Sequence, residues 1–331
     1  MAKPTQAKRP RSAERDGPNA MFFCHSCESM PELADESVAL TVTSPPYWNA
    51  IDYDRHAEDA TQNYRTREYA EGFGGYGEYL DSMSRCFSEV LRVTEPGGFC
   101  AVVIGTILDR GRHIPAPFDL LARLQGDGWW FHQDIIWHKC TAGVRRAGVT
   151  IQKPYPGYYY PNIMTEYILI FRKPATRGRL NGSRERRGAF PINALFTREI
   201  ANNVWHVAPV PPGVLDHPCP FPEEIPHRLI TLYSRPGSVV LDPFVGSGQT
   251  TKVASALGRR AVGYDIVPGY VRCAQRRVEE PLSIRPKQLV ARFDKIAVDE
   301  PLPERTKPTT RRGPRPPART SELFVNGVEP A

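Results

Sequence analysis

Apolar residues in the middle of this chain form short runs and helical stripes that alternate with each other. Runs rich in β-branched and aromatic residues predict buried strands at 37–43, 99–104, 130–137, 167–171, 238–241 and 259–264. Apolar residues at helical spacing predict helices near 79–91, 117–125, 223–233, 249–257 and 270–280. A short strand at 21–23 and a short helix or turn at 27–34 would precede them. Strands that alternate with helices predict an α/β fold.

Four stretches lack this pattern. Residues 1–20 and 282–331 are rich in proline and basic residues, which predicts a disordered basic arm and a disordered tail. Residues 49–77 are polar and rich in tyrosine and glycine, which is typical of a lid, a binding loop or a disordered segment. Residues 172–198 are basic and show no helical or strand period. One folded domain is therefore expected over 21–281, rather than two equal domains.

The net charge of +7 is unevenly distributed. The two tails together account for it, so the domain between them is neutral. Within that domain, residues 138–190 hold eleven Lys and Arg against two Glu, which the rest of the domain balances. Such asymmetry suggests one face for a polyanion, although a solvated basic loop explains the charge equally well.

Cysteine usage and hydropathy favour a cytoplasmic protein. The seven cysteines are scattered, and no apolar run has the length of a signal peptide or a membrane span. We therefore expect reduced thiols and no membrane association. Cys24 and Cys27 have the spacing of half a zinc site, but no second Cys or His pair accompanies them, so no metal is predicted.

A polar and aromatic turn, Ser44-Pro45-Pro46-Tyr47, follows the strand predicted at 37–43. Two prolines cannot continue a sheet ladder and donate no amide hydrogen, so the turn offers a hydroxyl and free carbonyl oxygens beside an aromatic ring. A planar ring with an exocyclic amine would suit it: its N–H groups would reach the Ser44 hydroxyl and the Pro45 carbonyl while Tyr47 stacks on the ring. Taken alone, the same residues are equally an ordinary turn that ends a strand.

A glycine-rich turn near the end of the domain has the layout of a nucleotide site. Asp242 ends one predicted strand, Gly246 and Gly248 lead into a helix, and Asp265 ends the next strand. In such sites the glycines let the backbone approach a ligand, and the second acidic residue accepts hydrogen bonds from ribose hydroxyls. The turn lacks the full Gly-x-Gly-x-x-Gly spacing, so NAD fits poorly.

Together these motifs resemble those of the amino-methylating DNA methyltransferases. The turn at 43–48 is similar to their catalytic turn, and residues 242–251 with 263–265 are similar to their S-adenosylmethionine site. Residues 217–222 resemble the segment that leads into that site. The order, with the catalytic turn first, the basic stretch second and the cofactor site last, resembles the permuted beta class, which has its target-recognition region between the two motifs.

The resemblance implies a Rossmann-like methyltransferase fold with a mixed, mostly parallel sheet. It divides the domain into a catalytic half at 21–171, a target-recognition region at about 172–205 and a cofactor half at 206–281. The implied reaction transfers a methyl group from S-adenosylmethionine to the exocyclic amine of a base flipped out of double-stranded DNA.

The resemblance also implies roles for single residues. Ser44, Pro45, Pro46 and Tyr47 would form the catalytic turn. The cofactor site would use Asp242 near the methionine amino group, Gly246 and Gly248 along its backbone, Asp265 on the ribose, and Phe221 and Phe244 in the adenosyl pocket, although each Phe could equally be core. The arginines expected to contact DNA are Arg145, Arg146, Arg177, Arg179, Arg184, Arg186 and Arg187.

Serine at the head of the turn resembles the cytosine-N4 enzymes, whereas adenine-N6 enzymes more often have Asp there. Cytosine N4 is therefore the expected target and adenine N6 the alternative. Many relatives have an Asp nineteen positions before the head of the turn, where this chain has His25, so the cofactor contact at that position is in question.

Two other functions fit the sequence less well. A protein-glutamine methyltransferase would begin the turn with Asn and have it after the glycine-rich motif. A non-catalytic nucleic-acid-binding protein would explain the basic segments but not the coexistence of both motifs. No nuclease motif is visible, so a restriction endonuclease partner would be a separate chain, and the sequence sets neither the recognition site nor the oligomeric state.

Overall fold

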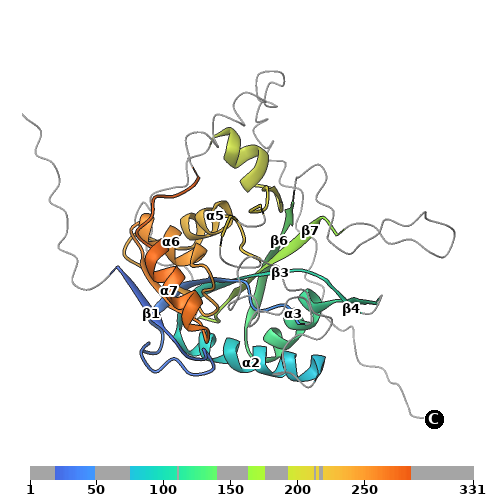
Figure 1. The fold of residues 1–331 in the computed structure, drawn as a ribbon. Coiled ribbons are helices and arrows are strands. Elements are labelled where there is room, and N and C mark those ends of the chain that lie inside the picture. Colours follow the sequence, from blue (N-terminus) through green and yellow to red (C-terminus); the bar gives the residue numbers. More distant parts are fainter. Residues whose placement is uncertain are drawn as a thin grey trace, which may run out of the picture.

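The computed structural model describes residues 19–48, 75–109, 112–139, 163–175, 193–211, 214–215 and 219–284. Its centre is an eight-stranded sheet with the order β1-β10-β9-β2-β3-β7-β6-β8 (Figure 1). The strands are β1 (Ala20–Phe23), β2 (Val38–Thr43), β3 (Thr94–Ile104), β6 (Trp130–His138), β7 (Thr165–Arg172), β8 (Val204–His206), β9 (Val239–Asp242) and β10 (Arg260–Tyr264). Neighbours pair in parallel except for β7, which is antiparallel to β3 and β6. The expected mixed, mostly parallel sheet is thus confirmed.

Helices cover both faces of the sheet. They are α2 (Tyr76–Val93), α3 (Ala116–Gly126), α5 (Glu224–Tyr233), α6 (Gln249–Ala256) and α7 (Pro268–Arg277). Proline stands in the first turn of α3 and of α7, where an amide hydrogen would have no partner in the helix. None of the described helices is long and apolar enough to cross a membrane.

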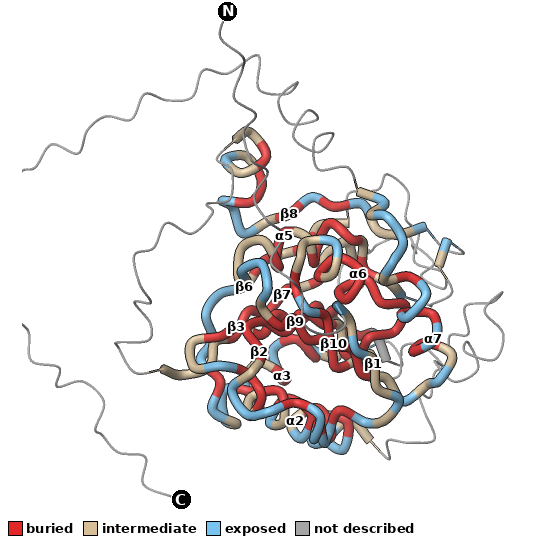
Figure 2. Tube along the Cα trace, turned by 90° about the vertical axis from the view of Figure 1, so that its left-hand side faces the viewer, coloured by how far each residue is buried: buried red, intermediate tan, exposed pale blue. Residues whose placement is uncertain are grey.

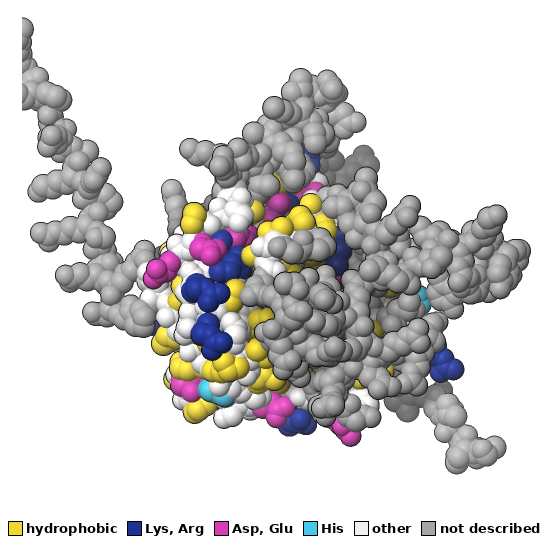
Figure 3. Space-filling model, viewed as in Figure 1, with side chains coloured by type: hydrophobic (Ala, Val, Ile, Leu, Met, Phe, Trp, Pro, Cys, Tyr) yellow, Lys and Arg dark blue, Asp and Glu magenta, His cyan; other side chains and the backbone are white. Residues whose placement is uncertain are grey.

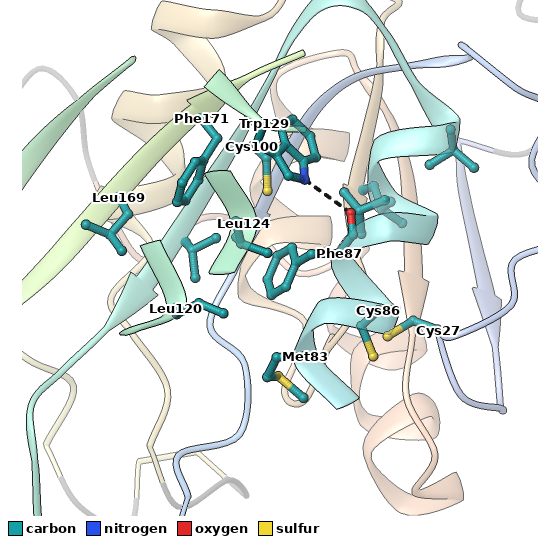
Figure 4. Close-up of a cluster of buried hydrophobic side chains, with 14 of the residues drawn as sticks. Cys27, Met83, Cys86, Phe87, Cys100, Leu120, Leu124, Trp129, Leu169 and Phe171 are labelled. Atoms are coloured by element: carbon teal, nitrogen blue, oxygen red, sulfur yellow. Dashed lines mark hydrogen bonds between the residues drawn. The ribbon is translucent and has the colours of Figure 1, made fainter. Parts of the chain in front are cut away.

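Alternating side chains of the strands build two cores. In β3, Val102 and Ile104 join the cluster formed with α2 and α3, while Ala101 and Val103 join the cluster formed with α5 and α6. Figure 4 shows part of the first cluster, in which the indole N–H of Trp129 donates to the carbonyl of Phe87 at 3.2 Å. β2 and β9, next to each other in the sheet, are accordingly buried throughout (Figure 2).

The path of the chain reverses between β2 and β9. From β2 the chain passes through α2 to β3 on one side, and from β9 it passes through α6 to β10 on the other side. In open α/β sheets, ligands bind outside the carboxyl ends of the strands at such a reversal. The topology therefore directs attention to the residues that follow β2, β9 and β10.

The structure corrects several predictions. β3 is longer than the strand predicted at 99–104: it begins at Thr94, directly after α2 ends at Val93, so the proline and glycines at 96–98 lie within the strand, with a register shift between Val38 and Leu40 of β2. α2 begins inside the loop predicted at 49–77, whereas residues 27–34 form turns, which is one of the two predicted alternatives. Four short elements were not predicted: the hairpin of β4 (Ile107–Asp109) and β5 (Arg112–Ile114), the π-helical turn η1 (Phe196–Ile200) and β8.

Candidate active site

The two motifs lie side by side at the carboxyl edge of the sheet. β2 and β9 are paired neighbours, and they end at Thr43 and Asp242. The Thr43 hydroxyl donates a hydrogen bond of 2.6 Å to Oδ1 of Asp242, between residues 199 positions apart in the sequence. Asp265 follows β10, the neighbour of β9 on its other side. The catalytic and cofactor motifs predicted from the sequence therefore share one site.

The turn after β2 combines hydrogen-bond acceptors with an aromatic ring whose position is fixed by a hydrogen bond. Pro45 is buried, and Ser44, Pro46 and Tyr47 are partly buried. No described residue forms a hydrogen bond with the Ser44 hydroxyl or the Pro45 carbonyl. The Tyr47 ring packs against the α2 cluster, and its hydroxyl donates to Oε2 of Glu166 at 3.0 Å. Acceptors and ring thus lie together, as a planar amine-bearing substrate requires.

The glycine-rich turn after β9 needs its glycines for two reasons. Gly246 has φ +46° and donates its N–H to Oδ2 of Asp265 at 2.9 Å. Gly248 has φ +79°, and a Cβ there would lie 2.8 Å from the Cα of Ala274 in α7. Gly248 is therefore required by packing against α7 as well as by its left-handed backbone.

Two carboxylates at this edge are desolvated. Asp242 is 2% exposed, and burial raises its pKa to about 7 in spite of hydrogen bonds from Thr43 and from the N–H of Phe244. Burial also raises the pKa of Asp265 to about 6, against hydrogen bonds from the N–H groups of Val267 and Gly246. No described residue forms an ion pair with either carboxylate. Acidic groups without a cation suit a positively charged ligand, and S-adenosylmethionine has both a sulfonium and an ammonium group.

The two phenylalanines differ in their surroundings. Phe221 is 7% exposed within the α5 cluster, and its carbonyl accepts a hydrogen bond of 2.7 Å from the Gln249 side chain. Phe244 is partly buried next to Asp242, with its ring centroid 6.3 Å from that of Phe87. Phe221 is thus a core residue in this structure, whereas Phe244 borders the site.

Comparison with known proteins agrees with this geometry. Residues 38–276 match the DNA methylase family that comprises N6 and N4 enzymes. The chain belongs to this N6/N4 DNA methylase family. The methylase is 30% identical over 292 residues to Type II methyltransferase M.MthZI of Methanothermobacter thermautotrophicus, covering 83% of this chain and 80% of that protein. It is 28% identical over 303 residues to Type II methyltransferase M.MjaI of Methanocaldococcus jannaschii, and the match covers 83% of this chain and 95% of that protein.

Solved structures agree on the fold. A protein of Thermus thermophilus assigned as a DNA modification methylase is 30% identical, with a TM-score of 0.57 over 79% of this chain and 95% of that one. The same protein has been solved with S-adenosyl-L-methionine, and there the TM-score is 0.55. The PvuII cytosine-N4-specific DNA methyltransferase has a TM-score of 0.58 at 17% identity, and the match covers 84% of this chain and 93% of that one. The methylase therefore has the expected Rossmann-like fold and is an S-adenosylmethionine-dependent DNA methyltransferase.

His25 lies at the same edge as the carboxylates of the methylase. β1 ends at Phe23, whose carbonyl accepts the N–H of Asp265 at 3.2 Å. Nε2 of His25 lies 2.9 Å from Glu32, which also accepts a hydrogen bond from the Tyr264 hydroxyl. The Ser26 carbonyl and Glu32 raise the pKa of His25. His25, at the position where the resemblance would have implied an Asp, therefore forms a pair with Glu32.

Sequence reasoning missed a buried ionic network beneath the glycine-rich turn. Nζ of Lys252 lies 2.8 Å from Oε1 of Glu223, and Arg277 lies 3.6 Å from the same oxygen. Arg277 also donates to the Ser247 carbonyl and to Oε1 of Gln249. The network fixes the turn to α6 and α7. Its members are charged residues on helices predicted correctly, but their partners are distant in the sequence.

The arginines predicted to contact DNA lie outside the described residues, in 140–162 and 176–192. They are Arg145, Arg146, Arg177, Arg179, Arg184, Arg186 and Arg187. Among described residues, α7 exposes Arg272 and Arg276, and dark blue basic side chains mark the α7 side of the molecule in Figure 3.

Proposed function

We propose that this methylase transfers a methyl group from S-adenosylmethionine to the exocyclic N4 amine of a cytosine flipped out of duplex DNA. The observation that carries the proposal is the pair of acceptors at Ser44 and Pro45, which no described residue occupies and which lie one strand away from Asp242. The serine favours cytosine over adenine by its resemblance to the cytosine-N4 enzymes.

The turn would act by orienting the amine. An amine conjugated to an aromatic ring is a poor nucleophile, because its lone pair is delocalised. Hydrogen bonds from its two N–H groups to the Ser44 hydroxyl and the Pro45 carbonyl favour a pyramidal nitrogen with an available lone pair. Tyr47 would hold the ring by stacking. Bound S-adenosylmethionine would supply an electrophilic methyl group and leave as S-adenosylhomocysteine, and the methylated amine would lose one of its two protons to solvent.

The cofactor residues would divide the ligand between them. Asp242, which is buried and forms no ion pair with a described residue, would face the methionine ammonium group. Asp265 would accept hydrogen bonds from ribose hydroxyls through lone pairs left by its backbone contacts. The turn at Gly246 and Gly248 would lie along the cofactor, and Phe244 would border its adenosyl group.

Chain order supports membership of the permuted beta class. β2 and the catalytic turn precede β9 and the glycine-rich turn, and the basic stretch lies between them. We assign the catalytic half to 21–171, target recognition to about 172–205, including part of the arginine-rich stretch, and the cofactor half to 206–281. Arginines there would neutralise phosphates and read base edges.

The test is nucleoside analysis. Mixed-sequence duplex DNA is incubated with the methylase and S-adenosylmethionine, digested and analysed by mass spectrometry, with Ser44→Ala as the control. N4-methylcytosine that depends on Ser44 is the expected product. N6-methyladenine instead would overturn the assignment of the base, and the absence of any methylated base would overturn DNA as the substrate.

A further inference from the structure

Glu166 reaches the active-site edge from the antiparallel strand. β7 runs opposite to β3, so its first residues lie where the parallel strands end, and Tyr167 pairs with Ile104 at the end of β3. Glu166, one residue earlier, is 7% exposed. A carboxylate buried at this edge requires partners, because an isolated buried charge is strongly unfavourable.

Both oxygens of this carboxylate have a partner. Oε2 accepts the hydrogen bond from the Tyr47 hydroxyl at 3.0 Å, and Oε1 accepts one from Nζ of Lys139. Lys139 follows β6, its N–H donates to the Met164 carbonyl at 2.9 Å, and its Nζ lies 4.9 Å from the centre of the Trp137 ring. The ammonium group therefore contacts the carboxylate oxygen that the Tyr47 hydroxyl does not contact.

The local backbone makes room for this carboxylate. A Cβ on Gly105, just past β3, would lie 3.0 Å from Cγ of Glu166. The ion pair is not needed to set the register of β6 and β7, which already pair from Trp130–Arg172 to His138–Thr165. What it adds is a charged acceptor of fixed position for the one phenol that belongs to the catalytic turn.

We infer that Glu166, with Lys139 as its counter-ion, is a positioning residue that fixes the Tyr47 ring for stacking on the target base. The inference rests on the proposed function, in which Tyr47 contacts that base. The ring is held at both ends, by the backbone after Pro46 and by its hydroxyl. A hydrogen bond at the phenol hydroxyl fixes the orientation of the ring without itself covering a ring face.

A double-mutant cycle tests this coupling. Tyr47→Phe removes only the hydroxyl, and Glu166→Gln keeps the shape of the side chain but removes its charge. We expect each change to slow single-turnover methylation about tenfold at saturating DNA and cofactor, the size expected for a hydrogen bond to a charged group. The double variant should be no slower than the single ones. The dissociation constant for S-adenosylmethionine should stay unchanged in all three.

Additive effects would overturn the inference, because a rate reduced about a hundredfold in the double variant means that Glu166 acts independently of Tyr47. A loss of cofactor affinity in Glu166→Gln, or a slow Tyr233→Phe control, would also do so. Tyr233 is a suitable control because its hydroxyl accepts a hydrogen bond from Gln133 outside the catalytic turn.

A second readout does not require activity. In protein with ¹³C-labelled tyrosine, Tyr47→Phe identifies the Tyr47 ring resonance, and Glu166→Gln should shift it. An unshifted resonance would overturn the inference even if the wild type methylates DNA. A shifted resonance would support it even if the wild type methylates no base, which would instead refute the proposed function.

Discussion

The affinity of this methylase for S-adenosylmethionine should depend on the ionisation of Asp242. Burial raises the pKa of this carboxyl to about 7, so the free protein holds it largely protonated at mildly acid pH. A cationic ligand beside it favours the ionised form. Binding at low pH must therefore release a proton, and the apparent affinity must fall.

The size of the effect follows from the pKa. If the cofactor binds only the ionised carboxyl, protonation raises the apparent dissociation constant about 11-fold at pH of about 6 and about 1.3-fold at pH of about 7.5. Asp265, with its pKa of about 6, adds a further factor of up to about two. We expect binding to be about ten times weaker at the lower pH.

Calorimetry in buffers of different ionisation enthalpy measures both the affinity and the proton released. Asp242→Asn keeps an acceptor for the Thr43 hydroxyl but cannot ionise, so it should bind weakly and with about twofold pH dependence. His25, whose pKa is also raised, remains in this variant and serves as the internal control. A pH dependence equally steep in Asp242→Asn would refute the assignment of the effect to Asp242.

The same carboxyl should make the free protein less stable as the pH rises. Its pKa is raised on folding from 3.8 to about 7, so the folded state keeps a proton that the unfolded state releases between these values. Its contribution to stability is fully present below pH of about 4 and is lost as the pH rises through about 7, a change on the order of 4 kcal/mol. Urea unfolding of the apo-protein should show Asp242→Asn to be more stable than wild type at pH of about 7.5. A less stable variant would show that the buried Asp242 carboxyl does not destabilise the free protein at this pH.

Other substitutions should separate the parts of the site. Ser44→Ala should lower the single-turnover rate about 10- to 100-fold with little change in cofactor affinity, and Asp265→Ala should weaken cofactor binding about tenfold or more. Equal losses of affinity in both would contradict their roles. Gly248→Ala should lower the free energy of unfolding by about 1–3 kcal/mol more than Gly258→Ala, which has a similar φ but open space at its Cβ. Arg277→Met should cost about 1–3 kcal/mol in the same urea assay, because Glu223 keeps Lys252 but the Ser247 carbonyl and Oε1 of Gln249 lose their buried donor. A loss below about 1 kcal/mol would show that Arg277 does not stabilise the turn.

Local patterns predicted most of this fold, and the exceptions have physical reasons. The apolar runs form strands because their residues face two cores, as in β3 and β7. β8, β4 and β5 have three residues each, too few to show a period. The composition of residues 96–98, one proline and two glycines, is typical of a turn. They nevertheless lie within β3, because the pairing of β3 with β2 is irregular there.

The site was predictable only where its signal is local. The turns at Ser44 and Gly246 combine residue types that are rare together, so each could be found from the sequence. The role of Glu166 could not, because its partner Tyr47 is 119 positions away and a single Glu before an apolar run has no distinctive pattern. Sheet order is also a long-range property, and it decides which strand ends become neighbours.

That order explains why the two motifs can form one site although they lie in different halves of the chain. β2 and β9 meet only by lateral pairing, so the edge they form is independent of which strand comes first in the sequence. On the β9 side this edge has the carboxylates that suit the cofactor, and on the β2 side it has the acceptors and the ring that suit the base. The bond between Thr43 and Asp242 joins the two sides. This division predicts that substitutions on the β9 side, such as Asp265→Ala, lower the affinity for the cofactor. Substitutions on the β2 side, such as Ser44→Ala, should instead lower the rate of methyl transfer.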